Sequence, residues 1–173
     1  MRNEMKVMKK IISGCLFLCA SYAAAAGIHD TGPFARVFDV ISAKDVLSKN
    51  STSLFKNLVG LCAYKEPIGP DRHSQGNVQC GADTEIKKMT VSGTEGPNIF
   101  MVSAVIYGKE KCDYMRQVLS KNFGRPKKLE GDCHMEWAAK GSKGHGRTLV
   151  GMQLSKEENQ IYFSINEEEE SEP

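Results

Sequence analysis

The sequence predicts a single α+β domain in which an antiparallel sheet of five to six strands is packed by two to three helices. Three observations lead to this fold class: one amphipathic helical pattern ends at a Gly-x-Pro signal, several segments alternate apolar and polar residues, and the pentapeptide VLSKN occurs twice. Strand side chains repeat every second residue and helical side chains every three to four, so the patterns identify the element types. Two αβββ halves would account for the order of these elements.

The clearest helix signal covers residues 110–123, EKCDYMRQVLSKNF. Apolar residues recur there mostly at spacings of three and four, which predicts an amphipathic helix. Gly124 follows at the position where helices commonly end, and Pro126 cannot continue a helix. The second copy of VLSKN, residues 118–122, is therefore expected to form the last turn of this helix.

Strands are predicted for the remainder of the second half. In residues 131–139, alternation places Cys133, Met135 and Trp137 on one face, typical of a core, and His134 and Glu136 on the other. Residues 148–154 and 161–165 also alternate, and the polar turn SKEENQ between them predicts a hairpin.

The first half is predicted less sharply. Residues 43–50 indicate a short helix with Ser42 as its N-cap, and 53–62 indicate a second helix from leucines at helical spacing. Residues 66–77, EPIGPDRHSQGN, are expected to form an exposed loop. Residues 86–108 predict another hairpin, whose return strand IFMVSAVI is almost continuously apolar, as in a central strand.

The two hairpins resemble each other. The sequence KKMTVSGTEGPNIFMVSAVI can be aligned with LVGMQLSKEENQIYFSINEE, so that Met89 matches Met152 and Ile99 matches Ile161. A VLSKN segment precedes the hairpin in both halves. Internal duplication is one reading, and independent recurrence of helix-exit and hairpin patterns is the other.

The ends of the chain predict processing. Residues 1–26 contain a basic segment, a short apolar run and an alanine-rich end, which are the parts of a cleaved signal peptide. We expect cleavage near Ala26, with Met5 or Met8 as alternative starts, and we disfavour lipid anchoring at Cys15. The expected divisions are the signal peptide 1–26, one domain over 27–166, and an acidic disordered tail 167–173.

Four cysteines remain after cleavage. An even count in an exported chain predicts two disulfides, and four cysteines allow three pairings. We favour Cys62 with Cys80 and Cys112 with Cys133, each within one half of the chain. Cys112 lies on the apolar helix face and Cys133 on the apolar strand face, so packing of helix on sheet would bring them together.

Charge adds one candidate binding segment. The mature chain would carry 19 Lys and Arg against 20 Asp and Glu, and the tail EEEESEP holds five of those acids. The glycine-rich loop GSKGHGR could bind an anion or a partner through four basic residues: Lys140, Lys143, His145 and Arg147. It joins two predicted strands, however, whereas phosphate-binding loops lead into a helix N-terminus.

No catalytic or metal-binding motif is evident. His134-x-Glu136 lacks the P-C-x-x-C partner of zinc deaminases, and no G-x-S-x-G sequence occurs. Carboxylates that meet only in space stay open as catalytic candidates: Asp83, Glu85, Glu95, Asp113, Asp132 and Glu136. We expect no catalytic residue, no metal, no cofactor and no nucleic-acid partner.

These features predict a small exported periplasmic or secreted binding protein without catalysis and without a stable membrane span. Its expected partner is a protein of the cell envelope, which it would serve as an accessory factor or occlude as an inhibitor or immunity-type protein. The alternatives are an enzyme acting on an envelope polymer and a polyanion-binding module.

Overall fold

The computed structural model describes residues 32–66, 75–93, 99–131, 133–141 and 146–168. The predicted signal peptide and the last five residues of the acidic tail lie outside these ranges. The helices and strands are α2 (Pro33–Ile41), η1 (Val46–Ser48), α3 (Ser51–Lys56), β1 (Cys62–Glu66), β2 (Gln75–Cys80), η2 (Ala82–Thr84), β3 (Ile86–Gly93), β4 (Ile99–Tyr107), η3 (Lys109–Lys111), α4 (Cys112–Phe123), β5 (Lys128–Glu130), β6 (His134–Lys140), β7 (Arg147–Ser155) and β8 (Gln160–Glu168).

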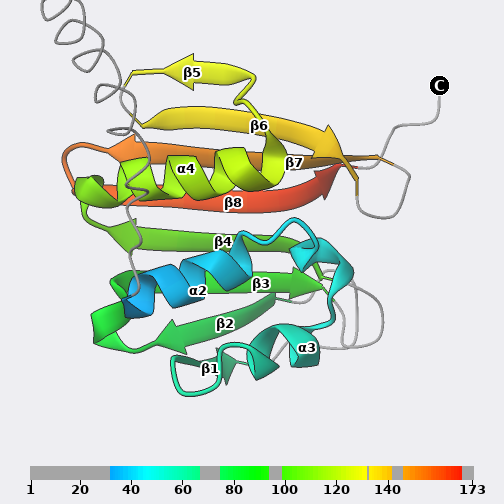
Figure 1. The fold of residues 1–173 in the computed structure, drawn as a ribbon. Coiled ribbons are helices and arrows are strands. Elements are labelled where there is room, and N and C mark those ends of the chain that lie inside the picture. The colour runs from blue at the N-terminus through cyan, green and yellow to red at the C-terminus, as the bar shows by residue number, and fades with distance from the viewer. Residues whose placement is uncertain (1–31, 67–74, 94–98, 132, 142–145, 169–173) are drawn as a thin grey trace, which may run out of the picture.

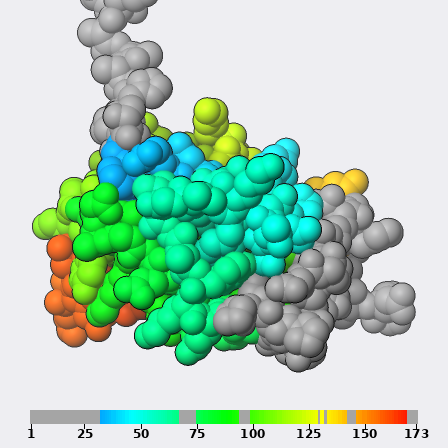
Figure 2. Space-filling view, turned by 90° about the horizontal axis from the view of Figure 1, so that it is seen from below, coloured from blue at the N-terminus to red at the C-terminus, as the bar shows by residue number. Residues whose placement is uncertain are grey.

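The strands form one antiparallel sheet in the order β1-β2-β3-β4-β8-β7-β6-β5, and α2 and α4 lie across one of its faces (Figure 1). Seen from below, α2 (blue) lies on the upper side of the molecule and part of the β7–β8 segment (orange) on the lower side (Figure 2). The predicted α+β class is therefore confirmed. The sheet has eight strands among the described residues rather than five or six.

Each half of the chain contributes helical segments followed by four strands in sequential order, and the halves meet where β4 pairs with β8 (Figure 1). The predicted order of elements is thus repeated in both halves, with four strands instead of three. The extra strands are short or polar. β1 and β5 form the two edges of the sheet, and β5 has only three residues.

The strand registers of the β3–β4 and β7–β8 hairpins show which parts of their sequence similarity are also structural. Met89 pairs with Ala104, Met152 pairs with Phe163, and Ala104 pairs with Phe163, so the two methionines occupy matching places. The return strands are offset from the sequence alignment, because Ile161 faces Leu154 whereas Ile99 faces Gly93. A register shift between Ser92 and Gly93 in the first hairpin contributes to this offset, and the second hairpin has no such shift.

The two VLSKN copies do not occupy equivalent places. The first forms η1 and then Asn50, whose Oδ1 caps α3 by accepting from Ser53 N at 2.8 Å. The second lies within α4. The predicted N-cap role of Ser42 was wrong: Ser42 ends α2 and donates its hydroxyl to the Phe38 carbonyl at 2.6 Å.

Two further expectations in the first half need correction. The predicted helix over 53–62 ends at Lys56, and Cys62 already begins β1. Leu54 and Leu58 are buried as a helical pattern requires, which explains the overestimate. The predicted loop 66–77 contains the end of β1 and the start of β2, while its residues 67–74 lie outside the described ranges.

Helix α2 was not predicted, although its signal is present in the sequence. Pro33 occupies the first helical position, and Phe34, Val37, Phe38 and Ile41 are buried at helical spacing. The Phe38 ring packs edge-on against Phe163 of β8 with centroids 5.2 Å apart. Helix α2 therefore covers the seam between the halves.

Helix α4 and strand β6 are joined as the sequence predicts. A disulfide links Cys112 at the start of α4 to Cys133 before β6. At the other end of the helix, Trp137 Nε1 donates to the Gly124 carbonyl at 3.0 Å. Cys133, Met135 and Trp137 are buried, which confirms the predicted core face of this strand.

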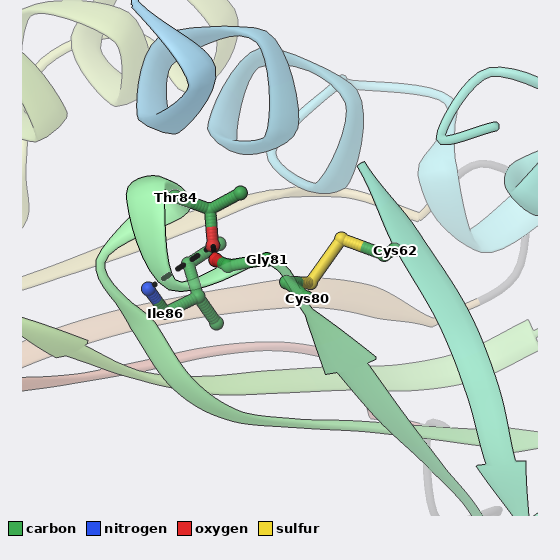
Figure 3. The surroundings of a disulfide bond; sticks show 5 residues. All are labelled: Cys62, Cys80, Gly81, Thr84 and Ile86. Carbon is green, nitrogen blue, oxygen red and sulfur yellow. Dashed lines mark hydrogen bonds between the residues drawn. A yellow bond between two sulfur atoms is a disulfide. The ribbon is translucent and has the colours of Figure 1, made fainter. Parts of the chain in front are cut away.

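The second disulfide joins Cys62 of β1 to Cys80 of β2, two residues that face each other in the register (Figure 3). The turn that follows is held by Thr84, whose hydroxyl donates to the Gly81 carbonyl at 2.6 Å and accepts from Ile86 N at 3.4 Å. Both favoured cysteine pairings are therefore present. They tie the β1 edge and the α4–β6 contact within their own halves.

Candidate functional site

The face of the sheet opposite α2 and α4 bears the candidate site. No helix of the described residues covers this face, and it contains a groove of about 410 Å³ that crosses five strands. The residues that line the groove come from β3, β4, β8, β7 and β6: Lys88, Thr90, Ser103, Ala104, Val105, His134, Met135, Glu136, Gly151, Met152, Gln153, Tyr162, Phe163 and Ser164.

Small residues form the floor of the groove. Thr90 pairs with Ser103, Ser103 with Ser164, and Ser164 with Gly151, so four small residues stand side by side across four strands. Their side chains alternate away from the buried methionines and phenylalanine of the core. In the described part of the chain, no side-chain hydrogen bond involves these three hydroxyls. They are therefore available to a bound group.

Gly151 is the member of this row that has no side chain. A Cβ placed there would meet only the Ser164 hydroxyl, at 3.6 Å, which is an ordinary van der Waals distance. The glycine therefore serves no tight backbone approach, and its lack of a side chain leaves space above the floor.

An exposed tyrosine, Tyr162, lines the groove on its middle strand β8. Tyr162 is 45% exposed, and its hydroxyl donates to Glu158 at 2.5 Å. This hydrogen bond raises the pKa of Tyr162. Tyr107, 44% exposed, lies near it on β4, and the Lys87 ammonium stands 5.5 Å from the centre of the Tyr107 ring.

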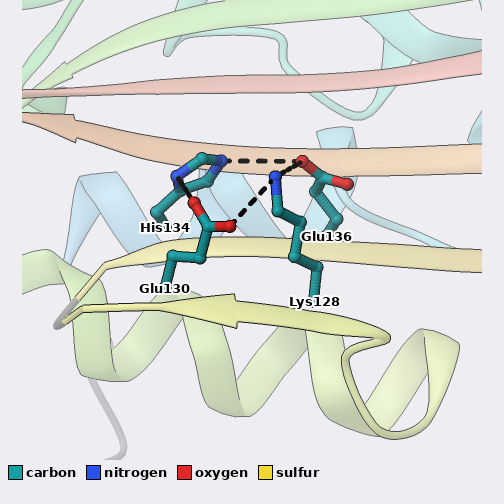
Figure 4. Close-up of polar contacts among 4 residues, drawn as sticks. All are labelled: Lys128, Glu130, His134 and Glu136. Carbon is teal, nitrogen blue, oxygen red and sulfur yellow. Dashed lines mark hydrogen bonds and ion pairs between the residues drawn. The ribbon is translucent and has the colours of Figure 1, made fainter.

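A ring of four polar side chains stands at the β6 end of the groove, which two of them, His134 and Glu136, line (Figure 4). Lys128 Nζ lies 3.3 Å from Glu130 and 3.5 Å from Glu136, and His134 places one ring nitrogen 3.3 Å from Glu130 and the other 3.5 Å from Glu136. The hydrogen bond to Glu130, and the charges of both carboxylates, raise the pKa of Lys128. These contacts join edge strand β5 to β6.

The ring is not a metal centre by its composition, since an ammonium group occupies the position between the two carboxylates. More widely, the described residues contain no group of three or more His, Cys, Asp or Glu side chains that could hold a metal ion. His134 and Glu136 alternate outward as the sequence predicts, but their partners Lys128 and Glu130 were not among the candidate residues.

Two of the predicted anion-binding residues are described: Lys140 ends β6 and Arg147 begins β7, and neither lines the groove. In the strand register Lys140 stands opposite Arg147, and Arg147 stands opposite Glu168 of β8. The acidic end of β8 therefore lies beside these two basic residues. Lys143 and His145 lie outside the described residues. The structure thus brings together two of the four predicted residues and does not bring them to the groove.

The candidate carboxylates are similarly dispersed. Asp83 lies in η2, Glu85 pairs with Lys111, and Asp113 pairs with Arg116. Of the four described candidates only Glu136 lines the groove, and Glu95 and Asp132 lie outside the described residues.

The groove residues were missed because no local motif contains them. Thr90, Ser103, Gly151 and Ser164 come from four strands and resemble ordinary solvent-facing positions of alternating segments. The only signal in the sequence was their small size on the polar face of strands that are otherwise rich in large residues.

Comparison with protein-family models, with curated proteins and with solved structures gives no match to this chain. Among the described residues, the structure contains no helix with the length and apolarity that a membrane span needs.

Proposed function

We propose that this protein is an exported, non-catalytic binding protein that docks a protein partner on the open face of its sheet. The observation that carries the proposal is the groove across β3, β4, β8, β7 and β6, which has a floor of small residues and is also lined by an exposed tyrosine and charged residues. Concave sites with a few placed polar groups are typical of binding surfaces. The partner would be a component of the cell envelope, served or inhibited by this protein.

Export is supported by two independent features. The N-terminal 26 residues have the composition of a signal peptide. The two disulfides in the described domain, Cys62–Cys80 and Cys112–Cys133, are of a kind that persists in oxidising compartments such as the periplasm.

The proposal of binding without catalysis is supported by the spacing of the reactive side chains. A serine nucleophile needs a base within hydrogen-bond reach. Ser164 is on β8 and His134 on β6, with β7 between them, which separates them by about two strand spacings, or roughly 10 Å. His134 is also engaged on both sides by Glu130 and Glu136.

The decisive experiment fills the groove. Gly151→Leu would project an aliphatic side chain above the floor with no close backbone contact to disturb the fold. The tagged protein and this variant are used to capture partners from envelope extract, alongside Lys121→Leu, an exposed change on α4. We expect a stoichiometric partner that Gly151→Leu loses and Lys121→Leu retains.

If a partner binds Gly151→Leu as tightly as it binds the unchanged protein, the groove is not the docking site. Recovery of no stoichiometric partner, together with release of soluble fragments from purified envelope polymer by the protein, would favour the enzymatic alternative instead.

A further inference from the structure

The charges around the groove are unequal in how far they are already neutralised. On the β6 side, Glu136 lies within 3.5 Å of both Lys128 and His134. Glu158 accepts the hydrogen bond of the Tyr162 phenol and keeps its negative charge. On the β3 side, Lys88 lines the groove, and within the described residues no carboxylate pairs with it. The uncompensated positive charge is therefore confined to the β3 end of the groove.

Lys87 strengthens this asymmetry. Its ammonium lies over the face of Tyr107 and forms no ion pair in the part of the chain that the structure describes. A cation–π contact leaves the positive charge in place, whereas a salt bridge offsets it. By contrast, Lys111 pairs with Glu85 at 2.5 Å. Two adjacent lysines of β3 thus keep uncompensated charges: Lys88 lines the groove, and Lys87 lies over the Tyr107 ring.

The floor of the groove suits a segment of main chain. Hydroxyl groups donate and accept hydrogen bonds, so Thr90, Ser103 and Ser164 can bond both the N–H and the C=O groups of a peptide. From β3 to β6 the groove crosses four strand spacings, about 19 Å, which is the length of about six extended residues.

We propose that the groove binds an extended acidic segment of the partner protein. Its carboxylates lie against Lys88 and Lys87, its main chain bonds the hydroxyl row, and a side chain packs on Tyr162. This inference rests on the proposed function and specifies the partner's chemistry. Charge complementarity argues for it, because a basic segment would face two unpaired lysines, and a neutral one would leave them unused.

A peptide selection tests the inference without knowledge of the partner. A random library displayed on phage is selected against the disulfide-bonded protein, and enriched peptides are synthesised with a fluorescent label. We expect the enriched peptides to carry net negative charge. Their affinity, measured by fluorescence anisotropy, should fall on the order of tenfold in Lys87→Glu/Lys88→Glu. Lys87→Arg/Lys88→Arg and the distant control Lys121→Glu should bind as the unchanged protein does.

A charge swap separates recognition from a merely structural effect. Replacing each acidic residue of an enriched peptide by Lys should abolish binding to the unchanged protein and restore it to Lys87→Glu/Lys88→Glu. Enrichment of neutral or basic peptides, failure to enrich any peptide, or equal binding by the charge-reversed variant would overturn the inference. So would tighter retention of a free polyanion such as heparin than of any enriched peptide.

The two proposals fail in different ways. If Gly151→Leu abolishes capture of the envelope partner but Lys87→Glu/Lys88→Glu does not alter it, the open face is the docking site and the acidic segment is wrong. If neither change affects capture, both proposals fall.

Discussion

Ala104 of β4 stands directly opposite Phe163 of β8, and this pair lies at the joint between the two halves of the chain. Both residues are buried on the face of the sheet that the helices cover (Figure 1). The Phe163 ring contacts Phe38 of α2 edge-on, with centroids 5.2 Å apart. One helix, two halves and the centre of the sheet therefore meet at a single aromatic side chain.

Phe163→Ala should weaken the whole fold rather than one edge of it. Phe163 is 2% exposed, so its removal leaves a cavity that α2 and β4 cannot fill without moving. We expect a loss of about 3–5 kcal/mol in the free energy of unfolding, measured by chemical denaturation of the oxidised protein. Tyr162→Ala, the next residue but on the exposed face, is the control and should cost far less. Equal losses would contradict the central role of Phe163.

The two disulfides should differ in their contributions. Their partners are separated by 18 and 21 residues, so chain entropy predicts a similar loss of about 3 kcal/mol for each when both cysteines become alanine. Cys112 and Cys133 are also buried in the core, whereas Cys62 and Cys80 lie near the sheet edge. Cys112→Ala/Cys133→Ala should therefore be the less stable variant in denaturant titrations. Peptide mapping without reduction that found any other pairing would contradict the assignment.

Two glycines should respond in opposite directions to alanine. Gly151 is in a regular strand with free space for a Cβ, so Gly151→Ala should raise the free energy of unfolding by about 0.5–1 kcal/mol. Gly124, which ends α4, has φ of 81° and ψ of −156°. Gly124→Ala should therefore cost at least about 1–2 kcal/mol. Thermal or chemical denaturation measures both changes in the free energy of unfolding. Changes of the same sign would contradict these two backbone assignments.

The Tyr162–Glu158 contact should be visible in an alkaline titration. The hydrogen bond to Glu158 is the main cause that raises the pKa of Tyr162 above its ordinary value near 10. A raised pKa means that the contact stabilises the fold below about pH 10, and that this contribution is lost as the pH rises through the folded-state pKa. The tyrosinate absorbance that is lost in Tyr162→Phe belongs to Tyr162. In the unchanged protein it should therefore appear at higher pH than the absorbance of free tyrosine. In Glu158→Ala it should return toward the ordinary value, and no change in that variant would exclude the contact.

Much of the second half was predictable because its signals are local. The alternation of Cys133, Met135 and Trp137 and the Gly124 helix end each occupy a few residues, and the structure confirms them. The first half was harder for a physical reason: β1 and β2 are short and polar, so neither periodicity nor apolar content distinguishes them from a loop. Helix α2 was recognisable from its apolar spacing and was overlooked.

The candidate site was much less predictable than the fold. Sequence reasoning selected the basic loop around Lys140 and Arg147, since clustered charge is conspicuous along a chain. The groove depends instead on Ser103, Ser164 and Gly151, which are unremarkable individually and far apart in the sequence.

By itself the sequence determined the types of most elements and the faces they bury, because side-chain periodicity acts over a few residues. It favoured the two cysteine pairings without excluding the other two connectivities. Only the tertiary structure decided that β4 lies beside β8, that both long helices lie on the same face, and that a row of small residues crosses the other. Strand neighbours are chosen by the burial of the whole apolar face, with Ala104 against Phe163 at its centre. The burial that decides which strands are neighbours comes from segments some sixty residues apart, so no local sequence pattern contains it.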